Sequence, residues 1–267
     1  MRVLVVTAVP AERDAVVRGV VSATETATEA GAGAEAAEAE VSVPGGRTLH
    51  RVVRSPLTVD ALAAGVGPAA AAAATATALT AAELGQTPYG LVVSAGIGGG
   101  FAPAPLGSVV VGEAIVAADL GAETPDGFAA VTELGFGTVE HLPPPALVRA
   151  VAEATGAVRG AVLTVSTVTG SAERAAELRR RHPGAAAEAM EGFGVAEAAA
   201  AHSMPAAPGV PGAHGVPGVP VLELRAISNA VGPRDRAAWR IGEALDALAG
   251  AFRHLPSALA TWKGPSR

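Results

Sequence analysis

The chain contains no cysteine, and this absence excludes disulfide bonds, cysteine-ligated zinc sites and thiolate nucleophiles. Aromatic residues make up only 3% of the 267 residues and charged residues only 16%, while half of the chain is hydrophobic. Ala and Val supply most of that apolar content. A chain of this composition can build a sizeable core, so we expect a folded protein and not a disordered one.

Long hydrophobic runs are also missing. The apolar run at 3–6 is too short for a signal peptide, and the charged residues Glu12, Arg13 and Asp14 follow it closely. The Ala-rich stretch 69–82 is too short and too weakly apolar to span a bilayer. We therefore expect a cytoplasmic protein with no membrane partner.

Positive charge is scarce, because 19 Lys and Arg residues face 25 Asp and Glu residues, for a formal net charge of -6. The one basic cluster, 179–181, fits the last turn of a helix, where cations complement the helix dipole. We therefore expect no nucleic-acid partner. His141, His182, His202 and His214 show no ligand spacing, so we expect no metal and no other cofactor.

Strand-like and helix-like patterns alternate along the chain. The β-branched run 3–7 predicts a buried strand, and Pro10 then opens a helix. Further strands are expected at 52–53, 59–66, 91–94, 109–111, 115–116, 161–165, 188–190 and 221–227, and helices at 68–84, 144–155, 172–181, 192–202 and 236–252. This alternation predicts a single-domain, three-layer α/β/α protein with a central mixed sheet.

Two stretches fall outside that alternation. Residues 22–47 show no firm period and are expected to form a variable surface excursion. Residues 205–219 repeat a Gly-Val-Pro theme, which cannot sustain a helix or a central strand. We interpret this second stretch as an inserted loop within one domain spanning 1–267.

Ligands in such folds bind at the carboxyl ends of strands. Glu12 follows the first strand directly, so its carboxylate can polarise a water or simply favour the start of a helix. After the strand 91–94, the glycine-rich stretch 94–101 can bring backbone N–H groups close to a ligand or form a tight turn with positive φ. Its spacing matches neither a dinucleotide fingerprint nor a phosphate-binding loop. We expect Ile97 and Gly98 to contact the substrate.

Two further strand ends carry polar residues. Met190 can supply an apolar face to a planar base or pack in the core, and Glu191 can accept two hydrogen bonds from a vicinal diol. Ser228 and Asn229 end the strand that begins at 221, where they can cap a turn or bind substrate. The amide of Asn229 can donate and accept in one plane, which suits the O6/N7 edge of a 6-oxopurine.

Taken in order, Pro10-x-Glu12, Gly67 before an Ala-rich helix, the stretch 94–101, Met190-Glu191 and the run 225–229 resemble the methylthioadenosine nucleosidase branch of the nucleoside phosphorylase superfamily. The resemblance covers most of the chain except 22–47 and 205–219. It implies a nucleoside phosphorylase-like fold, a small-molecule purine nucleoside as substrate, and a homodimer or higher oligomer. It also implies that Glu12 activates the attacking water and that Met190 and Glu191 bind the ribose.

One position departs from that branch, because Asn229 stands where its members have Asp. A carboxylate suits the amino group of adenine but repels the carbonyl of a 6-oxopurine, to which an Asn amide can donate. The ending Ser228-Asn229-x-x-Gly232 resembles the futalosine hydrolases, whose substrate carries hypoxanthine. This resemblance implies release of hypoxanthine from futalosine in menaquinone biosynthesis, with Asn229 stabilising the departing base. A 6-oxopurine nucleoside phosphorylase, a methylthioadenosine-type nucleosidase and a non-catalytic purine-nucleoside-binding module remain open.

Overall fold

The computed structural model describes residues 1–23, 36–203 and 218–262. Its strands are β1 (Arg2–Thr7), β2 (Ala37–Val43), β3 (Arg47–Arg54), β4 (Leu57–Ala63), β5 (Leu91–Gly100), β6 (Val109–Ala117), β7 (Gly121–Thr124), β8 (Gly127–Ala130), β9 (Glu140–His141), β10 (Val158–Thr164), β11 (Ala185–Ala189) and β12 (Val221–Ala230). Its helices are α1 (Pro10–Val21), α2 (Pro68–Leu84), α3 (Pro145–Thr155), α4 (Ala172–Arg181), α5 (Gly192–Ala201), the short 3-10 helix η1 (Arg236–Ala238) and α6 (Ile241–Thr261). None of these helices has the length and apolarity needed to cross a membrane.

The central sheet is mixed and partly closed on itself. Its strand order is β11-β10-β6-β12-β5-β1-β4-β3-β2, and β11 also pairs with β5. β12, β5, β1 and β4 run parallel to one another, so their carboxyl ends lie at one edge of the sheet. The unbroken apolar sequence of β1 follows from this arrangement, because a parallel strand covered on both faces exposes neither set of side chains.

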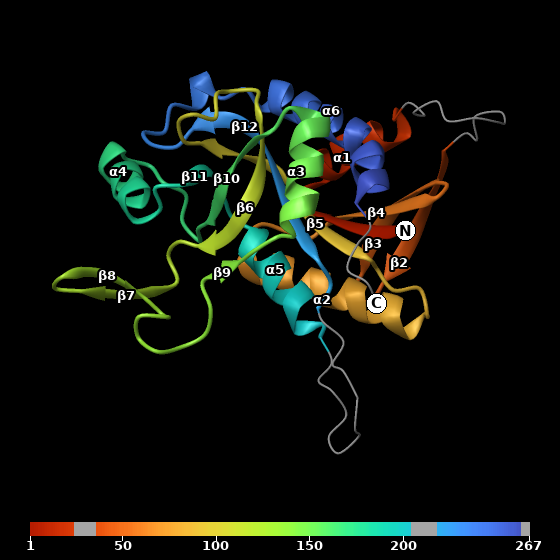
Figure 1. The fold of residues 1–267 in the computed structure, drawn as a ribbon, viewed down its shortest axis with the longest axis horizontal. Helices are drawn as coiled ribbons and strands as arrows, with labels where there is room; N and C mark the ends of the chain where they lie inside the picture. The colour runs from red at the N-terminus through yellow and green to blue at the C-terminus, as the bar shows by residue number, and fades with distance from the viewer. Residues whose placement is uncertain (24–35, 204–217, 263–267) are drawn as a thin grey trace, which may run out of the picture.

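Helices cover both faces of the sheet (Figure 1). α1, α3 and α6 pack on one face around a core that includes Val3, Leu147 and Phe252. α2 and α5 pack together on the other face. The two-stranded β7–β8 hairpin extends away from the body of the protein (Figure 1). This layering agrees with the predicted three-layer α/β/α arrangement.

Two features differ from the sequence-based predictions, and two predicted stretches lie largely outside the described residues. Residues 37–43 form the edge strand β2 and not a surface excursion; its mostly exposed side chains conceal the pattern that burial on one face would produce. The last helix begins at Ile241 and not at Arg236, because Asp235 caps the separate turn η1. Residues 24–35 of the predicted excursion and residues 205–217 of the predicted insertion lie outside the described residues.

A buried ion cluster joins the amino-terminal ends of β1 and β5 to β4. Asp60 on β4 is fully buried, and its carboxylate accepts hydrogen bonds from Arg2 at 2.6 Å, Arg51 at 2.7 Å and the hydroxyl of Tyr89 at 2.7 Å. Burial opposes ionisation of Asp60, but these hydrogen bonds outweigh it and hold its pKa below the ordinary value. The cluster lies at the opposite end of the strands from Glu12, and we expect it to stabilise the fold.

Replacing Asp60 with Asn should lower the free energy of unfolding by about 3 kcal/mol, because two arginines lose their buried partner. For a chain of this size, that corresponds to a fall in Tm of roughly 10 °C at neutral pH. Since the folded pKa of Asp60 is depressed, its contribution is complete above an ordinary carboxyl pKa of about 4 and disappears as the pH falls through the folded value. In thermal melts at pH 7 and at decreasing pH, the Tm difference between the two proteins should therefore begin to shrink below about pH 4.

Asp246→Asn is the matched control, because Asp246 forms an exposed ion pair with Arg18. This variant should melt within about 1 °C of the unmodified protein. A Tm for Asp60→Asn as high as that of the control would contradict the structural role of the cluster.

Candidate active site

The polar residues predicted to carry function gather at the carboxyl ends of the parallel strands. Glu12 lies in the first turn of α1, just after β1, and Glu191 follows β11 at the start of α5. Asn229 lies near the end of β12, which is hydrogen-bonded to β5. The structure therefore brings residues that are far apart in the sequence to one edge of the sheet.

Glu12 is buried, with 3% of its surface exposed, and backbone amides hold its carboxylate. Oε1 accepts a hydrogen bond from the N–H of Ile97 at 2.8 Å, and Oε2 accepts from the N–H groups of Ala8 at 3.0 Å and Val9 at 3.2 Å. Glu12 caps its own helix, because Val9 is the N-cap residue of α1. An ordinary helix-start charge is also exposed to solvent, however, whereas the burial of Glu12 and its bond to β5 hold its carboxylate in one orientation.

The pKa of Glu12 is raised above its ordinary value. Burial is the main cause; the guanidinium of Arg225 and the hydrogen bond from Ile97 act in the opposite direction, and the nearby charge of Glu191 adds to the rise. A carboxylate with a raised pKa is a stronger base once it is ionised. Glu12 therefore has the electrostatic setting that a general base requires.

Glu191 is held by Arg225 and by a glycine. Its Oε1 accepts from the N–H of Gly67 at 3.1 Å, and its Oε2 lies 3.2 Å from Nη1 of Arg225. Gly67 precedes α2 with φ of 95°, a conformation that strains residues with a side chain. The predicted importance of Gly67 thus has a physical basis, because its backbone turns to donate to Glu191.

Arg225 pairs with two carboxylates, those of Glu191 and Glu223, and lies near a third, that of Glu12. It is almost fully buried on β12, where its Nε donates to Glu223 at 2.9 Å and its Nη2 donates to Ser94 at 2.9 Å. A Cβ atom placed on Gly96 would lie 2.6 Å from Oε1 of Glu12 and 2.8 Å from Nη1 of Arg225, so both groups converge on this glycine. Burial raises the pKa of Glu223 to about 7 against the opposing effect of Arg225.

The glycine-rich stretch continues β5 and is not a turn. Gly96, Gly98, Gly99 and Gly100 all belong to this strand, and none of them has positive φ. Glycine is needed in this strand because other groups approach its backbone closely. A Cβ on Gly98, for example, would lie 2.8 Å from the carbonyl oxygen of Glu188. The alternative interpretation as a tight turn is therefore wrong.

The predicted binding residues Ile97, Gly98 and Ser228 join the site through internal contacts. The N–H of Ile97 donates to Glu12, and the carbonyl of Gly98 lies 3.3 Å from the hydroxyl of Ser228. The same hydroxyl lies 2.9 Å from Oδ1 of Asn229, whose Nδ2 donates to the carbonyl of Ala230 at 2.9 Å. These contacts orient the Asn229 amide and leave one N–H free for a ligand.

Met190 is half-buried between Ala189 and Glu191, and its N–H lies 3.3 Å from Oε2 of Glu191. Its position beside Glu191 is compatible with a contact to a ribose or a base. Whether Met190, Ile97, Gly98 and Ser228 touch a substrate stays a prediction.

Sequence reasoning assigned no role to Arg225, Glu223 or Glu188. All three are charged residues within otherwise apolar strands, and all are buried. A charge in a strand that reads as central costs free energy unless it has a partner. A charged residue within an apolar strand was therefore the sequence signal that could have identified these three residues.

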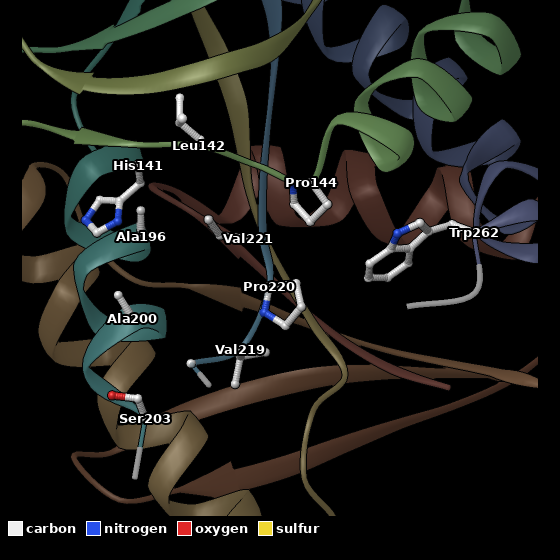
Figure 2. Close-up of a pocket in the computed structure, with 11 residues that line it drawn as sticks. His141, Leu142, Pro144, Ala196, Ala200, Ser203, Val219, Pro220, Val221 and Trp262 are labelled. Atoms are coloured by element: carbon white, nitrogen blue, oxygen red, sulfur yellow. The ribbon is translucent and has the colours of Figure 1, made fainter. Parts of the chain in front are cut away.

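A separate pocket of about 630 Å³ lies beside α5 (Figure 2). It is lined by His141, Leu142, Pro144, Ala196, Ala200, Ser203, Gly218, Val219, Pro220, Val221 and Trp262. Its described lining is mainly apolar and includes neither Glu12, Glu191 nor Asn229. We therefore place the candidate active site at the strand ends.

Among known proteins, the chain is similar to futalosine hydrolases. It is 63% identical over 268 residues to that of Streptomyces coelicolor, with 100% of both chains covered. It is 44% identical over 214 residues to that of Acidothermus cellulolyticus, which covers 77% of this chain and 78% of the relative. No family model matches the chain.

Solved structures confirm the predicted nucleoside phosphorylase-like fold. The native futalosine hydrolase of Helicobacter pylori matches with a TM-score of 0.70 and 16% identity over 97% of both chains. A 5'-methylthioadenosine/S-adenosylhomocysteine nucleosidase of Colwellia psychrerythraea, in complex with adenine, matches with a TM-score of 0.68 and 22% identity over 97% of this chain and 94% of the nucleosidase.

Proposed function

Because the chain belongs to the futalosine hydrolase family, we propose that it cleaves the N-glycosidic bond of futalosine with water, releasing hypoxanthine and dehypoxanthine futalosine. The observation that carries the proposal is the buried Glu12, held by three backbone amides next to the Arg225–Glu191 pair. This reaction would give the protein its place in menaquinone biosynthesis, and we assign it to the cytoplasm.

Cleavage proceeds through a transition state in which the ribose gains positive charge, as in other glycoside hydrolyses. Glu191 accepts hydrogen bonds from the ribose hydroxyls, and ionised Glu12 takes a proton from the water that attacks the anomeric carbon. Asn229 donates to the departing hypoxanthine and disperses the negative charge that develops on it. The anomeric carbon thus gains a bond to the water oxygen as its bond to the base nitrogen breaks.

The charges at the site favour water over phosphate as the nucleophile. Glu12, Glu191 and Glu223 are three buried carboxyl groups around one buried guanidinium, that of Arg225. An incoming phosphate would meet this excess of carboxylates in a poorly solvated site. This arrangement argues against a 6-oxopurine nucleoside phosphorylase.

The protein also presents a surface suited to a second copy of itself. Three large apolar residues are exposed close to the β7–β8 hairpin in the sequence: Leu120 (42%), which precedes it, and Leu134 (44%) and Phe136 (69%), which follow it. Apolar side chains concentrated on a projecting segment favour burial against a partner. This concentration supports a homodimer or higher homo-oligomer of single-domain chains.

Incubation with futalosine, inosine and methylthioadenosine, each with and without phosphate, tests the proposed function. We expect free hypoxanthine from futalosine at the same rate in both buffers, and slower release of base from the other two nucleosides. Chromatography of the free base and the sugar product provides the measurement. A requirement for phosphate, or faster cleavage of methylthioadenosine than of futalosine, would contradict the proposal.

A further inference from the structure

Glu188 is a buried carboxylate that the hydrolytic mechanism leaves without a role. It lies on β11 with 5% of its surface exposed, three residues before Glu191. Its Oε1 accepts from the N–H of Thr169 at 2.9 Å, and its Oε2 accepts from the hydroxyl of the same residue. No ion pair neutralises Glu188 within the described part of the chain. The more distant charges of Arg174 and Asp119 act on its pKa in opposite directions.

The sheet register places Glu188 opposite Asn229 across a glycine. Glu188 on β11 and Asn229 on β12 both pair with Gly99 of the strand between them, β5. Paired residues on neighbouring strands direct their side chains to the same face of a sheet. The Cα atoms of Glu188 and Asn229 are therefore about 10 Å apart, twice the spacing between strands.

Gly99 contributes no side chain of its own between Glu188 and Asn229, and its surroundings are closely packed. A Cβ atom there would lie 3.3 Å from Nδ2 of Asn229 and 2.9 Å from Cγ2 of Val231. The Asn229 amide therefore lies against the glycine, and the sheet register places Glu188 on the same face on its other side. A base held between Asn229 and Glu188 would lie beside Gly99 and Val231, with one polar edge toward each of the two polar residues.

The two residues match the polar groups of hypoxanthine. This base presents acceptors at O6 and N7 and a donor at N1–H, whereas adenine presents an acceptor at N1. Asn229 retains an N–H donor, and each carboxylate oxygen of Glu188 retains a lone pair after accepting from Thr169. Glu188 can therefore accept from N1–H of hypoxanthine, while it repels the N1 lone pair of adenine.

We propose that Glu188 is a specificity-determining residue that accepts a hydrogen bond from N1–H of the 6-oxopurine, while Asn229 donates to its O6/N7 edge. Thr169 orients the carboxylate through its two donors. The inference rests on the proposed hydrolysis of futalosine. It adds a residue that recognises N1–H of the base to the one that recognises the O6/N7 edge. It also accounts for a buried carboxylate that has no cationic partner in the part of the chain that the structure describes.

The test compares futalosine with aminofutalosine, which carries adenine, as substrates of Glu188→Gln. The Gln amide accepts less strongly than a carboxylate and can turn to donate to N1 of adenine. We expect kcat/KM for futalosine to fall at least about tenfold, and the ratio of futalosine to aminofutalosine efficiency to fall by at least about tenfold.

Glu223→Gln is the matched control, because it makes the same chemical change to another buried carboxyl group that contacts Arg225 and not Gly99. It should affect both substrates to the same extent and leave the ratio unchanged. A ratio unchanged in Glu188→Gln as well would overturn the inference and leave Glu188 as a support for Thr169.

A second measurement tests the inference even if the Glu188→Gln protein fails to fold. With the unmodified protein, hypoxanthine should inhibit at least about tenfold more strongly than 1-methylhypoxanthine, which has no N1–H. Equal inhibition by the two bases would overturn the inference. Failure of the unmodified protein to cleave futalosine would contradict the proposed function, which separates the two hypotheses.

Discussion

Replacing Glu12 with Gln should lower kcat for futalosine by about 10²–10⁴-fold, because an amide cannot take a proton from water. The KM should change little, since Glu191 and Asn229 remain to bind the substrate. The replacement should also cost about 1–3 kcal/mol of stability. Its NH₂ group must face either the N–H of Ile97 or the N–H groups of Ala8 and Val9, all of which donate to the carboxylate.

The pH profile gives an independent signature of the same role. The base acts only when it is ionised, and the pKa of Glu12 is raised, mainly by burial. The activity of the unmodified protein should therefore fall as the pH drops through this raised value, above the range of an ordinary Glu. The residual activity of Glu12→Gln should lack this acidic limb.

Asp14→Asn provides the control on the same helix, because the side chain of Asp14 is 55% exposed and, among the described residues, pairs with Arg13 alone. It should retain kcat within about twofold, as expected for a solvated surface charge. If Glu12→Gln cleaves futalosine within about threefold of the unmodified protein, Glu12 only favours the start of α1 and the mechanism is wrong.

Asn229→Asp should reverse part of the selectivity for the base. It removes an N–H₂ donor and places a carboxylate against the O6 edge of hypoxanthine, at a cost of about 1–3 kcal/mol. Turnover efficiency with futalosine should therefore fall at least about tenfold. Aminofutalosine should lose less or gain, because a carboxylate can accept from the amino group of adenine. The ratio of the two efficiencies should fall by at least about tenfold.

The ratio is the informative measurement because the structure predicts a loss common to both substrates. Nδ2 of Asn229 donates to the carbonyl of Ala230, and an Asp oxygen in its place would repel that carbonyl. Parallel kinetics on Asn229→Ala provide a control that removes the amide without adding a charge. If Asn229→Asp leaves the ratio unchanged, Asn229 only stabilises the end of β12 and base recognition depends on other residues.

The sequence by itself determined the helices and strands that are marked by a clear local pattern, such as an unbroken apolar run or a proline at a helix start. Unbroken β-branched runs defined β1 and the first part of β5, and Pro10 and Pro68 marked the starts of α1 and α2. The alternation of these elements was enough to predict a layered α/β/α protein. The order of the polar motifs along the chain was enough for the family resemblance, which the 63% identity to a futalosine hydrolase confirms.

The tertiary structure alone decided which residues meet. Glu191 and Glu223 pair with Arg225, and Glu12 lies near it, because β5 lies between β1 and β12 and because β11 turns back to pair with β5. Strand order and register depend on contacts between distant segments, which a pattern of period two or 3.6 along the chain does not encode. For the same reason, only the sheet register places Glu188 and Asn229 on either side of Gly99.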